Sequence, residues 1–158
     1  MKRTIQAAVI VLLILAAGVA AAATTTVAVS ARVVGTCRFN SGATMAFGDL
    51  LFDAAGTPLG TGPMTTTLTF WCTRNANYSI IDDAGLYDLV AGTQSMRSTT
   101  LGTPEYIPYS LTYAPATGTG AGPVGNDITL TLTGEVGAVY GDNTPDDYAD
   151  TVTLTITP

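Results

Sequence analysis

The sequence after residue 23 predicts an all-β domain built as a two-sheet sandwich, on the basis of three observations. It is rich in Thr, Val, Gly and Pro and poor in strong helix formers. Apolar and polar residues alternate in several short runs, and clusters of Gly, Pro, Asn and Asp separate these runs. Alternation with one apolar face is typical of antiparallel strands that bury one side. Seven or eight such strands in one domain favour a Greek-key sandwich.

The strands that we expect follow from this alternation. The clearest runs are residues 27–33, 68–72, 107–113, 128–133 and 151–157. In the last run Val152, Leu154 and Ile156 share one face, and threonines occupy the other. Weaker signals predict strands at residues 43–47, 78–81 and 86–90, and turns at residues 56–63, 115–126 and 142–147.

The first 23 residues have the pattern of a secretory signal peptide. Lys2 and Arg3 precede an apolar run over residues 7–19, and small residues follow up to Ala23. The run is shorter than the roughly 20 apolar residues of a membrane span. We expect cleavage after Ala23 and export of the mature chain; an uncleaved anchor is the alternative. No stable membrane insertion is expected after cleavage.

The charge of the mature chain excludes one class of function. Residues 24–158 contain four arginines and twelve acidic residues, which gives a net charge of −8. Nucleic-acid binding depends on a basic surface that neutralises phosphates, so no nucleic-acid partner is expected. The acidic balance itself indicates solubility.

Two cysteines, Cys37 and Cys72, stand in a chain that is expected to be exported. An even number of cysteines in an oxidising compartment predicts a disulfide bond. A zinc site is the weaker alternative, because the chain has no histidine and two thiols would need carboxylates to complete a tetrahedral set.

The sequence offers little for catalysis or metal binding, and we expect no enzyme, no cofactor and no metal. The absence of histidine excludes Ser-His-Asp and Cys-His arrangements. A carboxylate pair could perform acid–base hydrolysis, but the acidic residues lie beside predicted turns or strand ends, where they are ordinarily solvated. The acidic stretch at residues 142–150 could offer oxygen ligands to calcium, but it lacks EF-hand spacing and reads better as a polar turn.

The segment at residues 24–33 is unusual for a mature N-terminus, because chain ends are ordinarily frayed and polar. It alternates small apolar residues, so it needs a groove to occupy. Two interpretations remain open from the pattern alone. The segment pairs with its own sheet, or it completes the sheet of another subunit by β-strand addition.

The order and spacing of several short motifs resemble the spore coat protein U domain family, which includes the Csu-type pilins of archaic chaperone–usher pili. The likeness covers nearly all of the mature chain. Its motifs are residues 35–37 (GTC), 46–49 (AFGD), Cys72 followed by 78–80 (YSI), 95–97 (SMR), 107–113 (IPYSLTY), 139–141 (VYG) and 147–156 (DYADTVTLTI).

The resemblance implies an incomplete immunoglobulin-like sandwich that is completed by a donor strand from a neighbouring subunit. It implies the donor residues Val27, Val29, Ala31 and Val33. These residues lie an even number of positions before Cys37, as the donor residues of the family do. The expected organisation is a signal peptide at 1–23, a donor strand at 24–34 and a pilin-like domain at 35–158.

The partners implied are identical or related pilin subunits, a periplasmic chaperone and an outer-membrane usher. The implied location is an extracellular fibre on the cell surface, in which this chain would be a shaft or connecting subunit. The alternative function is a stand-alone secreted or spore-coat-like β-sandwich that acts as a binding module.

Overall fold

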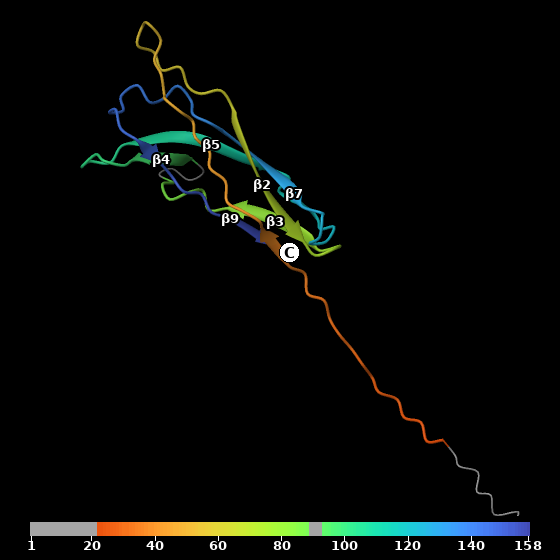
Figure 1. Cartoon of the computed structure of the whole chain (residues 1–158). Coiled ribbons are helices and arrows are strands. Elements are labelled where there is room, and N and C mark those ends of the chain that lie inside the picture. Colours follow the sequence, from red (N-terminus) through yellow and green to blue (C-terminus); the bar gives the residue numbers. More distant parts are fainter. Residues whose placement is uncertain (1–21, 89–92) are drawn as a thin grey trace, which may run out of the picture. The chain divides into compact units, whose positions relative to one another are not determined.

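The computed structural model describes residues 22–88 and 93–158, and every regular element in these residues is a β-strand (Figure 1). The chain divides into two units, residues 1–32 and the domain Val33–Pro158. Most of the predicted signal peptide lies outside the described residues. No helix in the described part of the chain is long and apolar enough to cross a membrane.

The larger sheet has six antiparallel strands in the order β1-β2-β7-β5-β4-β8. Its centre pairs Leu68 of β2 with Leu130 of β7, and Leu111 of β5 with Gly134 of β7. The strands are β1 (Cys37–Phe39), β2 (Met64–Cys72), β4 (Gln94–Ser98), β5 (Tyr106–Ala114), β7 (Ile128–Glu135) and β8 (Tyr148–Ala149).

The smaller sheet has three antiparallel strands in the order β6-β3-β9. They are β6 (Thr117–Thr119), β3 (Asn77–Asp82) and β9 (Leu154–Thr157). Strand β3 is central, and β9 forms one edge with Ile156 opposite Ile80.

Two apolar clusters hold the domain together. The larger one packs both sheets around Phe70, which is fully buried and meets Tyr78 edge-on at 5.0 Å between ring centroids. The smaller one surrounds Ile107, Val136 and Tyr140. Aromatic and branched side chains on alternate strand positions supply most of the larger cluster, as the sequence pattern predicted, whereas Val136 and Tyr140 of the smaller cluster lie outside the strands.

One predicted strand is wrong for a reason that matters to the site. Residues 43–47 run as an extended segment without a ladder, across the inner face of the larger sheet. The segment approaches β7 at Gly134, where an added Cβ would collide with the sulfur of Met45 and lie 3.0 Å from the Phe47 ring. A side chain at position 134 would therefore displace the ends of the Met45 and Phe47 side chains.

The expected strand at residues 86–90 is also wrong in its described part, because residues 86 and 87 form a turn and residue 88 is in no strand. Residues 89 and 90 lie outside the described residues. The strands β4, β6 and β8 were not among those expected; β6 and β8 have only three and two residues, and β4 consists largely of polar residues.

The two sheets form an immunoglobulin-like sandwich that is incomplete on one side. Strand β9 has β3 on one side and, in the described residues, no hydrogen-bonded strand on the other. The larger sheet likewise ends at β1. The side between these two edges is where the sandwich is open.

Candidate functional site

An apolar cleft of about 440 Å³ lies between the open edges of the sandwich. Its floor is the inner face of the larger sheet, formed by Leu68, Leu111 and Leu132. One wall is the chain at residues 39–43, and the other is the chain at residues 152–154. We call this the leucine cleft. No charged residue lines it.

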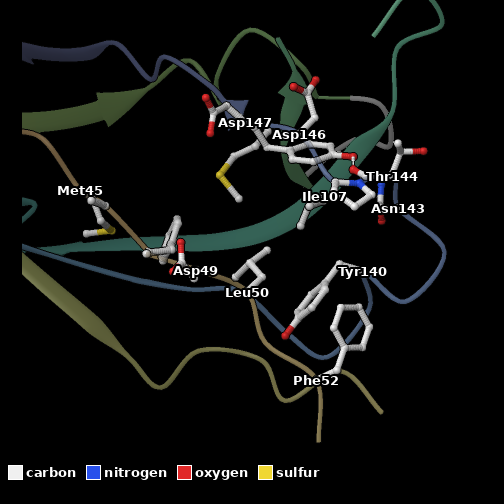
Figure 2. Close-up of a pocket in the computed structure, with 16 residues that line it drawn as sticks. Met45, Asp49, Leu50, Phe52, Ile107, Tyr140, Asn143, Thr144, Asp146 and Asp147 are labelled. Atoms are coloured by element: carbon white, nitrogen blue, oxygen red, sulfur yellow. Dashed lines mark hydrogen bonds between the residues drawn. The ribbon is translucent and has the colours of Figure 1, made fainter. Parts of the chain in front are cut away.

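A second cleft of about 540 Å³ is bounded by the continuation of the same two walls. Residues 45–50 and Phe52 form one wall, and residues 143–148 form the other (Figure 2). Apolar side chains such as Ile107 and Met96 form its inner surface together with Tyr140 and Tyr148. We call this the tyrosine cleft. The walls run in opposite directions along the chain. We call the two clefts together the groove, and its walls lie within residues 39–52 and 143–154.

Tyr140 fixes the far end of this groove, although its ring is almost fully buried. Its hydroxyl donates to the carbonyl of Leu51 at 2.6 Å and accepts from the amides of Leu59 and Gly60 at 3.2 and 3.1 Å. It thereby anchors a hairpin at residues 51–59, in which the Leu59 amide also donates to the Leu51 carbonyl. The Phe52 ring packs edge-on against Tyr140.

Two carboxylates position the wall at residues 143–148. Asp146 accepts from the hydroxyl and amide of Thr100 and from the amide of Leu101, and these bonds hold the pKa of its carboxyl below the ordinary value. Glu105 accepts from the amide and hydroxyl of Thr144, which likewise lower its pKa. The wall is therefore tied to the body of the domain by charge-assisted hydrogen bonds.

The opposite end of the groove lies near the disulfide bond between Cys37 and Cys72, with an S–S distance of 2.05 Å. The bond joins β1 to β2 at paired register positions. Gly35 lies close to Pro158, so the N-terminal segment enters the domain beside the end of β9.

The residues predicted to form a donor strand are exposed and outside any ladder. Residues 22–36 contain no strand, and the side chains of Val27, Val29 and Val33 are 81, 90 and 82% exposed. Ala31 and Arg32 are exposed as well.

Three other acidic residues lie outside the lining of the groove. Asp127 and Glu135 are exposed at the two ends of β7. Asp150 accepts from the Tyr109 hydroxyl at 2.7 Å and the Leu86 amide. Within the described residues no group of three or more acidic, cysteine or histidine side chains is placed to hold a metal ion.

Sequence reasoning did not identify the residues that build the groove. The walls are mostly irregular chain, with Phe39, Tyr148 and Leu154 at strand ends, and only their position over the sheet makes them a site. Tyr140 carried a usable signal, because a tyrosine between polar, glycine-rich turns needs a partner for its hydroxyl when its ring is buried.

The sequence model of the spore coat protein U domain matches residues 23–155. The chain belongs to the spore coat protein U domain family. No curated protein matches the chain.

Among solved structures, this spore coat protein U domain is similar to a chain of the CsuC–CsuE chaperone–tip adhesion subunit pre-assembly complex from the archaic chaperone–usher Csu pili of Acinetobacter baumannii. The TM-score is 0.51 and the sequence identity 20%, over 78% of this chain and 40% of that chain. The chain thus spans less than half of the similar one, and the likeness supports the fold.

Proposed function

We propose that this chain is a structural, non-enzymatic subunit of a surface pilus, joined to its neighbours by donor-strand complementation. The observation that carries the proposal is the open groove beside β9, in a domain whose own N-terminal segment is apolar, alternating and exposed. In a fibre, residues 24–34 of one copy fill the groove of the next. Edge pairing with β9 supplies the main-chain hydrogen bonds, and alternate side chains enter the clefts.

The donor segment and the walls contain similar numbers of residues. The donor segment at residues 24–34 has eleven, and the walls at residues 39–50 and 143–154 have twelve each. Val27, Val29, Ala31 and Val33 then face the floor of the groove, and the residues between them face water. Burying three valines contributes about 1.5–3 kcal/mol for each side chain, before ordering costs.

The family and the similar structure support the partners in this proposal. The similar chain comes from a complex of a chaperone with a pilus subunit. We infer that a periplasmic chaperone protects the groove before assembly, that an outer-membrane usher exports the subunits, and that residues 1–23 direct the chain to the periplasm. The fibre is extracellular.

The experiment exploits strand parity. Val29→Asp places a carboxylate in the groove, where an unpaired charge costs several kcal/mol, whereas Ser30→Asp adds the same charge on the water side. We expect Val29→Asp to abolish fibres on the cell surface, as seen by electron microscopy, and Ser30→Asp to leave them intact.

A second measurement separates donation from pairing of the segment with its own sheet. A copy of residues 24–34 is fused to the C-terminus of the mature chain, and the substitutions are made in the native N-terminal copy alone. Donation predicts that Val29→Asp leaves the melting temperature of this monomer unchanged. If Val29→Asp lowers the melting temperature while Ser30→Asp does not, the strand belongs to its own sheet, and a stand-alone secreted module becomes the better description.

A further inference from the structure

Charge is distributed unequally along the groove. The leucine cleft has no charged lining residue, whereas Asp49, Asp146 and Asp147 line the tyrosine cleft. Figure 2 shows Asp49 on one wall and Asp146 and Asp147 on the other. No basic side chain lines either cleft. One end of the groove is therefore acidic, and the end near the disulfide is neutral.

The donor segment has the opposite charge at one of its ends. Arg32 is the only charged residue between Thr24 and Val34, and its side chain is exposed. It alternates with Ala31 and Val33, so it points out of the groove when they point in. An arginine in this position lies at the rim, where exposed carboxylates can reach it.

The direction of the donated strand decides which end of the groove Arg32 meets. Every strand pair in the described residues is antiparallel, and β9 runs toward Pro158 at the disulfide end. A donor antiparallel to β9 begins at the disulfide end and brings Arg32 to the tyrosine cleft. A parallel donor brings Arg32 to the neutral end.

We propose that Arg32 of one copy pairs with the acidic rim of the tyrosine cleft in the next copy, formed by Asp49, Asp146 and Asp147, and that this pairing sets the direction and selectivity of subunit joining. The inference rests on the proposed function and adds to it a residue that discriminates between acceptor grooves. Rim charges act mainly on the association rate and its salt dependence, because solvent screens them in the final complex.

The test is a charge swap within one chain. The mature chain is unfolded with its disulfide intact and diluted into buffer of low ionic strength, and joining is followed as an SDS-resistant ladder. We expect Arg32→Glu to slow joining about tenfold, with a smaller effect at high salt. Adding Asp49→Lys and Asp147→Lys to the Arg32→Glu chain should restore the rate.

The substituted positions suit this design. The side chains of Asp49 and Asp147 are exposed and make no hydrogen bond in the described part of the chain, unlike that of Asp146. The control Arg38→Glu makes the same change of net charge on the exposed side of β1, opposite Trp71. It should join at the wild-type rate.

The outcomes separate this inference from the proposed function. A wild-type chain that forms no ladder overturns donor-strand joining itself. A wild-type ladder together with an unchanged rate for Arg32→Glu overturns the pairing alone. A slow Arg32→Glu chain that the two lysines do not rescue overturns the assignment to the acidic rim, as does an equal effect of Arg38→Glu.

Discussion

Replacing Tyr140 by phenylalanine removes one oxygen atom and should loosen the hairpin at residues 51–59. The Leu59 amide and the Leu51 carbonyl keep their bond to each other at 3.0 Å. The Gly60 amide has no second acceptor in the described residues, so it is left without a partner. An orphaned, partly buried donor costs about 1–3 kcal/mol, and each other lost hydrogen bond about 0.5–1.5 kcal/mol. We expect the hairpin to open about 2–3 kcal/mol more easily.

Hydrogen exchange measures this loss directly, because the hairpin opens locally. The Asp53 amide, which donates to the Thr57 carbonyl at 2.9 Å, reports on the hairpin without contacting Tyr140. A loss of 2–3 kcal/mol corresponds to exchange about 30- to 150-fold faster. The phenylalanine ring keeps its contact with Phe52, so the amides of β2 and β7 should exchange as in the wild type.

The matched control is Tyr78→Phe. Tyr78 is as deeply buried as Tyr140, but its hydroxyl makes no hydrogen bond in the described part of the chain. This change should leave exchange at Asp53 unchanged. Wild-type exchange in Tyr140→Phe, or an equal acceleration in both variants, would refute the role assigned to the Tyr140 hydroxyl.

Three further predictions concern the rest of the domain. Alkylation of the unreduced, denatured mature protein should add no label, because both thiols are in the disulfide bond. Replacing Cys37 and Cys72 by alanine should lower the free energy of unfolding, measured in urea melts, by about 3.5–4 kcal/mol. The reason is that the bond closes a loop with a sequence separation of 35. The folded-state pKa of Asp146 lies below its ordinary value of 3.8, because Thr100 donates to the carboxylate. Its stabilisation is therefore present above pH 3.8 and lost as the pH falls through the folded value. Asp146→Asn should melt below the wild type at neutral pH, and the difference should shrink as the pH falls below 3.8. Gly134→Ala should displace Met45 and lower stability by about 1–3 kcal/mol, and an unchanged melting temperature would contradict the close approach of the segment to β7.

Alternation located the strands at the centre of the larger sheet. Phe70 in β2 and Leu130 in β7 lie on the apolar faces that period two predicted, and both are buried. The reason is that burying one face of a sheet requires an apolar side chain at every second position, and this alternation is visible within a few consecutive residues. The strand β3, which buries Ile80, was expected from a weaker signal.

No alternation of apolar residues in the sequence predicts strand β4 or the groove. Gln94, Ser95 and Ser98 are polar yet buried, because β4 lies between β5 and β8, whose positions no local pattern gives. The wall at residues 43–47 alternates like a strand, but it crosses the larger sheet over Gly134 instead of pairing with it. Both features depend on contacts between residues that are far apart in the sequence, so no local pattern predicts them.

The position of the disulfide has a mechanical consequence for a fibre of the proposed kind. Tension along such a fibre enters each domain through the N-terminal segment and reaches Cys37 only three residues after Val34. The bond to Cys72 then transfers the load covalently from the three-residue strand β1 to the nine-residue strand β2, which is paired with β7 over seven residues. The tension therefore passes through the disulfide bond and does not pull β1 away from the sheet. A reduced fibre should begin to yield at β1, at lower force than an oxidised one.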